Sequence, residues 1–207
     1  GVQGAVSDPG SDGRTTNNHG SCFVAGTKVR MANGTDMKIE DIMTGDIVKG
    51  KDGDNKVIAL DPTLLGNRKL YSFNGNASYF VTSEHPFWTT DGWKSIKPEK
   101  TKERDGIDLY NELTGALKVG HEIHTLDGIV RIKSIEEKEI NTPDLQLYNF
   151  NVENDHSYFA DGYCVHNKGY SVATTGGWHP GSGTCFIAGT MVRMADGTDI
   201  KIEDVII

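Results

Sequence analysis

The chain has 207 residues and a formal net charge of −8, with 25 glycines, 36% apolar residues and 8% aromatic residues. This length suits one large domain or two small ones, and the composition is more typical of a turn-rich β protein than of a helical one. No basic stripe is visible, which argues against nucleic acid as a partner. No apolar run reaches the roughly 18 residues of a membrane-spanning helix, so we expect neither a nucleic-acid nor a membrane partner.

The predicted elements, in chain order, are mostly short strands. Residues 1–21 are a Gly-, Ser-, Asp- and Asn-rich flank that we expect to be flexible. Short β segments then alternate with turn signals such as Asn33-Gly34. The mixed-charge stretch Lys97–Arg104 is interpreted as a solvated loop, and residues 168–184 as a Gly-, Ser- and Thr-rich linker. The predicted strands include Lys28–Met31, Asp46–Val48, Lys56–Leu60, Tyr79–Thr82, Ile129–Ile135, Leu145–Val152 and Gly162–Val165.

Two internal repeats of different kinds are present. Residues 20–44 and 183–207 are identical at 17 of 25 positions. Their offset of 163 residues is too long for a solenoid, so we expect tandem domains, with residues 185–207 as the truncated start of a second one. A fainter strand–turn–strand pattern from Gly45 to Leu60 recurs 75 positions later, from Gly120 to Ile135. This second repeat predicts two related β lobes inside one domain.

Three cysteines, Cys22, Cys164 and Cys185, form a sparse, odd set that argues against a disulfide framework. No CxxC pair is present, so a structural zinc site is not expected. In the run His121-Glu122-Ile123-His124, one residue separates the glutamate from the second histidine, whereas the zinc-protease motif needs two. On a strand these two histidines would face opposite sides. No metal and no cofactor are predicted.

Three motifs carry the chemistry: CFVAGT from Cys22, VTSEHPF from Val81, and YNFNVENDHSYFADG from Tyr148, which is followed by a terminal VHN at Asn167. In this order they resemble the Hint superfamily (Hedgehog/intein), closest to inteins and bacterial intein-like domains. The resemblance covers residues 22–167. It implies an all-β, horseshoe-like fold with pseudo-two-fold lobes, whose two ends lie close together on paired central strands. The segment between His85 and Asp144 already holds core strands, so no homing endonuclease insert is expected.

At the upstream end, a cysteine that follows a flexible flank can attack the carbonyl of Ser21 and convert the amide into a thioester. His85 is the candidate for contacting the leaving nitrogen. Thr82 is the candidate for polarising the carbonyl or orienting His85. Many inteins carry Asp at the place of Asn149, which cannot ionise. The resemblance therefore assigns Asn149 to the site but leaves the activation of Cys22 open.

At the downstream end, the side chain of Asn167 can attack its own carbonyl, close a succinimide and release Lys168. His156 and His166 resemble the pair of histidines that serves this step in the family, because imidazole can act as base or acid near neutral pH. A standard intein has Cys, Ser or Thr where this chain has Lys168. We therefore predict cleavage at both ends, with inefficient splicing, by a monomer that acts once and in cis on its own flanking polypeptide.

Alternatives remain at this point. The order Cys, His, Asn also fits a cysteine protease acting in trans, and the same β pattern fits a non-catalytic interaction module. A Hedgehog-type processor is disfavoured because this chain ends its motif with His166-Asn167. Cys164 either fills the core, which is the usual place of a lone cysteine, or forms a disulfide with Cys22 that gates activity.

Overall fold

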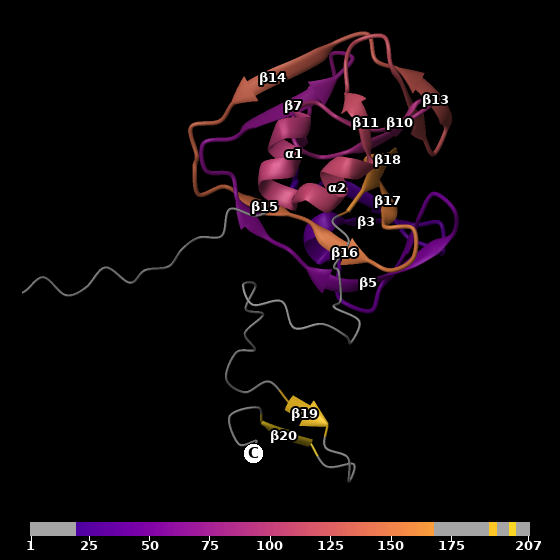
Figure 1. Ribbon diagram of the computed structural model, residues 1–207, viewed down its shortest axis with the longest axis vertical. Helices are drawn as coiled ribbons and strands as arrows, with labels where there is room; N and C mark the ends of the chain where they lie inside the picture. The colour runs from indigo at the N-terminus through magenta and orange to yellow at the C-terminus, as the bar shows by residue number, and fades with distance from the viewer. Residues whose placement is uncertain (1–19, 168–190, 194–198, 202–207) are drawn as a thin grey trace, which may run out of the picture. The chain divides into compact units, whose positions relative to one another are not determined.

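The computed structural model describes residues 20–167, which fold as one unit, and residues 191–193 and 199–201, which form a separate hairpin (Figure 1). The flank before Gly20, the linker 168–184 and Cys185 lie outside the described residues. The proposed division into flank, domain, linker and second domain therefore stays a prediction. Among the described residues, no helix combines the length and apolar character needed to span a membrane.

Strands dominate the folded unit, and two sheets hold most of them. The six-stranded sheet has the order β14 (Ile135–Glu139), β7 (Lys69–Phe73), β8 (Val81–Thr82), β1 (Phe23–Val24), β15 (Gln146–Tyr148) and β6 (Thr63–Leu64). The nine-stranded sheet has the order β11 (Leu113–Ala116), β10 (Gly92–Ser95), β9 (Phe87–Thr89), β12 (Glu122–Thr125), β18 (Tyr163–His166), β17 (Ser157–Ala160), β2 (Lys28–Arg30) and β3 (Asp36–Lys38), with β13 (Gly128–Arg131) beside β12.

A smaller sheet and three short helices complete the unit. The third sheet has the order β16 (Phe150–Val152), β5 (Asp54–Leu60) and β4 (Ile47–Lys49). A single 3₁₀ turn, η1, covers Ile39–Asp41, and the helices are α1 (Pro98–Asp105) and α2 (Ile107–Glu112). Figure 1 shows α1 and α2 side by side across the middle of the unit, with β5 at one end and β13 at the other. The predicted all-β fold is confirmed, since these two helices are its only long departure from strands and turns in the described residues.

The fainter repeat corresponds to two hairpins with the same hydrogen bonds. The Gly45 N–H donates to the Val57 carbonyl at 2.8 Å, and 75 residues later the Gly120 N–H donates to the Ile132 carbonyl at 2.8 Å. Both glycines have φ of 99°, a conformation that favours glycine. Both Val57 and Ile132 are fully buried. The two lobes predicted from the sequence are therefore present as equivalent turns that place equivalent apolar residues in the core.

A side-chain contact extends this equivalence and explains one of the histidines. Asp46 Oδ2 accepts a hydrogen bond from the Met43 N–H at 2.8 Å, and His121 Nδ1 accepts one from the Lys118 N–H at 3.0 Å. His121 thus caps the second turn as Asp46 caps the first. His124 instead stacks near the Trp88 ring. Within the described residues, no group of three or more His, Cys, Asp or Glu side chains could hold a metal ion.

The long repeat is also visible in the structure, because both copies form a two-stranded hairpin with the same pairing register. In the first copy, β2 pairs with β3 so that Lys28 faces Lys38 and Val29 faces Met37. In the second copy, β19 (Met191–Arg193) pairs with β20 (Asp199–Lys201) in the same register, each residue being 163 positions further along. The second copy therefore repeats the first hairpin, and residues 185–207 as the truncated start of a second domain stay a prediction.

The main core joins the sheets through aromatic side chains. Phe23 is fully buried and its ring packs near those of Phe80, Tyr158 and His85. Burying such a side chain contributes roughly 1.5–3 kcal/mol. Because Phe23 directly follows Cys22, this burial holds the upstream end of the folded unit against the core.

Several local predictions differ from the structure. The stretch Lys97–Arg104 is not a loop: Pro98 begins α1, where its fixed φ favours a first helical turn. The helix was missed because only Thr101 and Asp105 are buried on it, so no apolar periodicity exists. The predicted strand Ile129–Ile135 is two strands, β13 and β14, and Leu145–Val152 is also two, β15 and β16.

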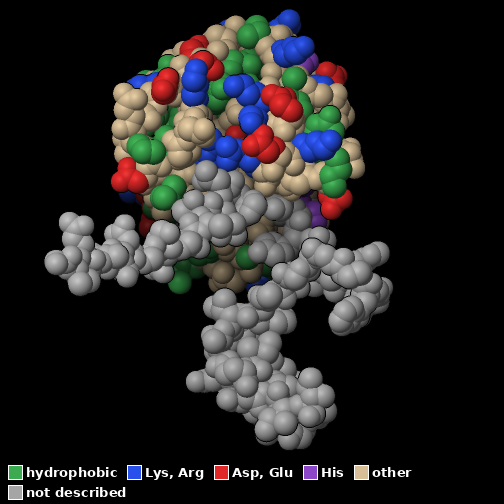
Figure 2. All heavy atoms as spheres, turned by 60° about the vertical axis from the view of Figure 1, so that its left-hand side comes forward, with side chains coloured by type: hydrophobic (Ala, Val, Ile, Leu, Met, Phe, Trp, Pro, Cys, Tyr) green, Lys and Arg blue, Asp and Glu red, His purple; other side chains and the backbone are tan. Residues whose placement is uncertain are grey.

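The surface carries both signs of charge. Figure 2 shows acidic and basic side chains interspersed over the face in view, with apolar side chains scattered between them. The large apolar side chains that are exposed in the described residues lie singly at positions such as Met43, Val119 and Ile129. Scattered exposure of this kind is ordinary for a folded domain.

Candidate active site

The two ends of the folded unit meet at one short segment, Asn149–Val152. Asn149 contacts the backbone of Ser21 at the upstream end, and the backbone of Val152 contacts Asn167 at the downstream end. The strands that carry these ends are central in different sheets, β1 between β8 and β15, and β18 between β12 and β17. The expectation that they pair with each other is therefore wrong. Proximity comes from Asn149–Val152, which crosses from the six-stranded sheet to the small one.

The carbonyl of Ser21 is held by an amide donor. Asn149 Nδ2 donates to the Ser21 carbonyl oxygen at 2.6 Å. The Asn149 Oδ1 atom accepts from the Phe150 N–H at 2.9 Å and from the Tyr158 hydroxyl at 2.8 Å. These two donors fix which end of the amide faces Ser21. Asn149, which cannot ionise, is thus held by Tyr158 and Phe150 with its amide donor toward the carbonyl of the bond before Cys22.

Thr82 holds the other side of the same peptide bond. Its Oγ1 accepts from the Cys22 N–H at 3.1 Å and lies 3.3 Å from the Cys22 carbonyl oxygen, to which its hydroxyl donates. The Thr82 N–H donates to that same carbonyl at 3.1 Å. Of the two contacts expected of Thr82, the one with the Ser21 carbonyl is made by Asn149 instead. Thr82 therefore hydrogen-bonds to the nitrogen of the Ser21–Cys22 peptide bond and not to its carbonyl.

The Cys22 side chain is fully buried, and its Sγ donates to the Gly20 carbonyl at 3.4 Å. Burial raises the pKa of this thiol well above its usual value. The nearby Arg68 guanidinium acts in the opposite direction, and the carboxylates of Glu84, Asp61 and Asp105 raise the pKa further. The thiol is therefore protonated at neutral pH.

The His85 ring is fully buried beside the same bond, with its centroid 4.3 Å from that of Phe23. Within the described part of the chain, neither ring nitrogen makes a hydrogen bond. Burial lowers the pKa of His85 to about 3, and the charge of His166 lowers this pKa as well. The polar backbone of Ser21 has the opposite effect and raises it. At neutral pH His85 is thus an uncharged base with an unused lone pair, a rare and costly arrangement in a core.

At the downstream end, Asn167 is fully buried and held by backbone groups. Its N–H donates to the His156 carbonyl at 2.8 Å. Its side-chain amide fits with Oδ1 accepting from the Val152 N–H at 2.6 Å and Nδ2 donating to the His156 carbonyl at 2.8 Å. The side chain is therefore folded back along its own backbone. Lys168, on the other side of the bond, lies outside the described residues.

His166 connects this bond to a helix that the sequence did not predict. Its Nδ1 makes a short contact with the Asn167 carbonyl oxygen, and its Nε2 lies 2.9 Å from Glu112 Oε2 at the end of α2. Both neighbours are acceptors, so both contacts are hydrogen bonds only when the ring carries two protons. This hydrogen bond from His166 lowers the pKa of the Glu112 carboxyl, while partial burial opposes the change.

His156 lies across from His166, with ring centroids 6.2 Å apart. Its φ is +52°, an uncommon conformation for a residue with a side chain. Its Nδ1 is 3.0 Å from the Val152 carbonyl oxygen, so Nδ1 carries the proton and Nε2 bears the lone pair when the ring is neutral. The rings of the two histidines thus lie near each other, and each of these residues contacts Asn167, His156 through its carbonyl and His166 through Nδ1.

Comparisons with known proteins agree with this fold. Residues 22–86 match the family described as Hom_end-associated Hint. The gp41-1 intein is 21% identical over 72% of this chain and 99% of its own, with a TM-score of 0.53. A bacterial intein-like domain from Clostridium thermocellum is 24% identical over 70% of this chain and 98% of its own, with a TM-score of 0.53. Residues 22–167 form a domain with the Hint fold.

A DnaB intein from Synechocystis has the same fold, at 16% identity over 72% of this chain and 99% of its own, with a TM-score of 0.50. No curated protein matches the chain. The resemblance stated from the sequence motifs is confirmed at the level of the Hint fold. At these identities the chemistry has to be argued from the residues of this Hint domain.

The second cysteine of this domain, Cys164, lies in the apolar core, as lone cysteines usually do. Cys164 is a free, buried thiol that packs in a small cluster with Trp93 and Phe159, and burial raises its pKa to about 12. Cys22 is also free and belongs to another cluster, with Leu65 and others. Of the two alternatives, core filling agrees with this packing.

Sequence reasoning missed two residues of the site, Tyr158 and Glu112. Tyr158 is buried on β17 and looks in the sequence like one more core aromatic, because its partner Asn149 lies on a different strand pair. Glu112 ends α2, a helix of six residues that is too short for an apolar periodicity to stand out in the sequence. The signal for Tyr158 was its hydroxyl, because a tyrosine in a buried strand usually hydrogen-bonds to a polar partner.

Proposed function

We propose that this Hint domain processes its own chain, cutting before Cys22 through a thioester and after Asn167 through a succinimide. One observation supports the proposal above all. The peptide bond between Ser21 and Cys22 is gripped on both sides, by Asn149 at the oxygen and Thr82 at the nitrogen, with the Cys22 thiol beside it. An ordinary core peptide has no reason to receive an amide donor, a hydroxyl acceptor and a thiol together.

At the upstream bond, Cys22 Sγ bonds to the Ser21 carbonyl carbon, and the bond from that carbon to the Cys22 nitrogen breaks. The thiol proton passes to the leaving nitrogen, so an amide becomes a thioester and a free amino group. Asn149 stabilises the negative oxygen that forms on the way. His85 relays the proton: its low pKa makes the imidazolium a strong acid, suited to protonating a leaving nitrogen.

At the downstream bond, Asn167 Nδ2 bonds to the Asn167 carbonyl carbon, and the bond to the Lys168 nitrogen breaks. One proton leaves Nδ2 and one reaches the departing nitrogen. The lone pair of His156 Nε2 accepts the first, and His166, placed between Glu112 and the Asn167 carbonyl, polarises that carbonyl and supplies the second. The folded-back amide contributes by proximity, because nucleophile and carbonyl belong to one residue.

The products follow from Lys168. A side-chain ammonium is not a nucleophile at neutral pH, so the thioester has no side-chain acceptor and ends in water. We therefore propose two cleavages as the main outcome. Low-level splicing follows when the freed amine of Lys168 attacks the thioester before water does.

Burial disfavours the alternative of a cysteine protease acting in trans. Cys22 is 0% exposed, and the carbonyl next to it is that of its own chain. A second substrate could reach the thiol only by displacing Gly20 and Ser21. The alternative of a non-catalytic module leaves the buried, unbonded nitrogens of His85 without purpose.

Mass spectrometry of purified precursor tests the proposal. Wild type should lose residues 1–21 and the segment from Lys168 onward, at rates that do not change on dilution. Cys22→Ala should abolish the first cut and keep the second, and Asn167→Ala should do the reverse. Precursor that stays intact for days between pH 6 and 9 with reductant present would falsify the proposal.

A further inference from the structure

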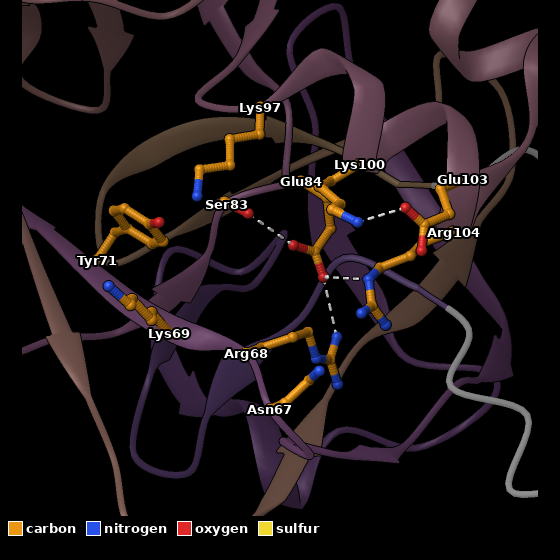
Figure 3. A pocket seen from close by; sticks show the side chains of 10 residues that line it. All are labelled: Asn67, Arg68, Lys69, Tyr71, Ser83, Glu84, Lys97, Lys100, Glu103 and Arg104. Carbon is orange, nitrogen blue, oxygen red and sulfur yellow. Dashed lines mark hydrogen bonds and ion pairs between the residues drawn. The ribbon is translucent and has the colours of Figure 1, made fainter.

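The proposed chemistry leaves one buried charged cluster unused. Arg68 and Glu84 are 8% and 1% exposed, and Arg68 Nη1 lies 2.9 Å from Glu84 Oε1. Arg104 approaches the same carboxylate at 3.8 Å, and Ser83 Oγ donates to its other oxygen at 3.1 Å. Figure 3 shows the Glu84 carboxylate between the two guanidinium groups, at a pocket of about 270 Å³. Buried ion pairs contribute little net stability, so another role is indicated.

This cluster contacts the peptide upstream of Cys22. Arg68 Nη1, besides pairing with Glu84, donates to the Gly20 carbonyl at 2.9 Å. Asp105, the last residue of α1, accepts the Ser21 N–H at 3.0 Å. The Gly20 carbonyl and the Ser21 N–H, both upstream of the scissile bond, are therefore each hydrogen-bonded to a charged side chain. Charge-assisted hydrogen bonds of this kind are the stronger ones in proteins.

The helix α1 is fixed to the catalytic motif, which sets the position of Asp105. Thr101 Oγ1 donates to the Glu84 carbonyl at 2.7 Å, and the Lys97 N–H donates to the Ser83 carbonyl at 2.9 Å. Ser83 and Glu84 lie between Thr82 and His85 in the sequence. The residues that bind the upstream peptide are thus tied to those that bind the scissile bond.

Position 20 accepts only glycine without strain. Gly20 is buried and has φ of +102°, a region that side-chain-bearing residues rarely adopt. A Cβ there would lie 2.9 Å from Asp61 Oδ2. The next residue, Ser21, is fully buried, which limits its size. The repeat of this region carries Gly183 and Thr184 before Cys185, so glycine followed by a small hydroxyl residue stands at both places.

We propose that Arg68, Asp105 and Asp61 form a specificity site that selects glycine two residues before the nucleophilic cysteine. The ligand is a peptide ending in glycine and a small residue, here the domain's own flank. This inference rests on the proposed function for its catalytic consequence, but binding of the flank can be measured apart from cleavage. Arg68 and Asp105 are positioning residues: they hold the peptide whose carbonyl reacts.

The first measurement uses cleavage. Gly20→Ala should slow the upstream cut by tenfold or more and leave release of Lys168 within twofold of wild type. Gly128→Ala, at the turn between β12 and β13, is the matched control, because Gly128 has φ of +113° with nothing near its Cβ position. It should leave both cuts within twofold. Asp105→Ala should slow the upstream cut, and Asp105→Asn, which retains an acceptor oxygen, should restore most of the rate. An upstream cut at the wild-type rate in Gly20→Ala overturns the proposal.

The second measurement does not depend on cleavage. In the inactive Cys22→Ala, Asn167→Ala precursor, amide hydrogen exchange followed by NMR reports whether the Ser21 N–H is bound. We expect at least 100-fold protection of this amide, kept when Gly128→Ala or Asp105→Asn is added and lost when Gly20→Ala or Asp105→Ala is added. A freely exchanging Ser21 amide in the precursor overturns the specificity site even if both cuts occur. A protected amide in a chain that never cleaves would sink the proposed function alone.

Discussion

The upstream and downstream junctions lie on one short segment yet differ in their electrostatics. Beside Ser21, the Cys22 thiol and the His85 ring are fully buried and uncharged at neutral pH, because burial raises the pKa of the first and lowers that of the second. Beside Asn167, His166 is hydrogen-bonded to a carboxylate whose side chain is half exposed. Under the proposed function, one reaction therefore starts from a neutral thiol and a neutral base, and the other from a histidine hydrogen-bonded to a carboxylate.

The difference follows from what each reaction needs. In a buried site without water, forming a free thiolate before the attack would cost free energy. The upstream step is therefore expected to transfer the thiol proton as the sulfur attacks the carbonyl. Succinimide formation has a weak amide nucleophile, and a charged acid at the carbonyl compensates for that weakness. The two cuts should therefore respond differently to pH and to mutation, which the following experiments exploit.

The largest expected effect is on stability rather than rate. His85 has a folded-state pKa of about 3 against 6.5 in its ordinary environment, so below pH 6.5 the unfolded chain binds a proton that the folded domain refuses. Stability contributed by keeping this ring neutral is present above pH 6.5 and is lost as pH falls toward 3. The loss reaches about 5 kcal/mol, at roughly 1.4 kcal/mol per pKa unit.

Urea unfolding of the Cys22→Ala, Asn167→Ala precursor at several pH values measures this loss. Adding His85→Phe removes the titrating ring and should flatten the pH dependence between pH 6.5 and 3 by an amount that approaches that figure. Carboxylates titrate in the same range in both proteins, so the comparison between the two isolates His85. Parallel curves would mean that the ring is not sequestered from protons in the folded state.

The next effect separates the junctions by rate. Asn149→Ala removes the donor to the Ser21 carbonyl and should slow the upstream cut by about 10²–10³-fold, the usual effect of losing one oxyanion donor. Release of Lys168 should change little. Tyr158→Phe removes one of two hydrogen bonds that orient this amide, and should cost the upstream cut a smaller factor, about 3–10-fold. Time courses followed by mass spectrometry give both rates from one sample, and equal slowing of both cuts by Asn149→Ala would contradict the assignment.

A smaller effect is expected at the downstream junction. Glu112→Gln keeps a hydrogen-bond acceptor for His166 but removes its charge, and should slow release of Lys168 about tenfold at neutral pH while the upstream cut is unchanged. In wild type the rate should fall at acid pH as the Glu112 carboxyl, whose pKa is lowered, takes up a proton, and Glu112→Gln should lack this limb of the profile. Asp108→Asn on the exposed face of α2 is the matched control and should leave the profile in place. An unchanged pH profile in Glu112→Gln would remove Glu112 from the account.

Cleavage in oxidising buffer should match cleavage in reducing buffer to within about twofold. Cys164 packs against Trp93 and Phe159 rather than against Cys22, so no disulfide between the two cysteines should form without disrupting the core. Cys164→Ala should leave both rates near wild type and lower stability by roughly 1 kcal/mol through lost packing. Slower upstream cleavage on oxidation that Cys164→Ala abolishes would restore the gating hypothesis.

Much of the fold could be predicted because its signals are local. The glycines at 45 and 120 require positive φ in equivalent turns, so their spacing alone indicated two lobes. The motif from Val81 to Phe87 and the terminal His166-Asn167 are likewise contiguous in sequence. These local signals gave Cys22, His85, His156 and Asn167 as site residues, and the structure brings them to two neighbouring junctions.

What the sequence did not reveal depends on contacts between distant elements. Tyr158 orients Asn149 from another strand, and Glu112 reaches His166 from a helix with no apolar stripe. Arg68 and Asp105 bind the upstream peptide across 48 and 84 residues of chain. The residues that flank such a charged side chain in the sequence do not indicate that it binds a peptide bond. Its binding partner is distant in the sequence and is brought near only by the fold.

Trapping the acyl group tests the central claim most directly. In hydroxylamine, a thioester between Ser21 and Cys22 releases residues 1–21 with a hydroxamate at Ser21, whereas direct hydrolysis of the amide releases a carboxylate. We predict that the released flank carries the hydroxamate in the wild-type chain, and that no flank is released from Cys22→Ala. A flank released as the carboxylate alone in saturating hydroxylamine, or released from Cys22→Ala, would contradict the account.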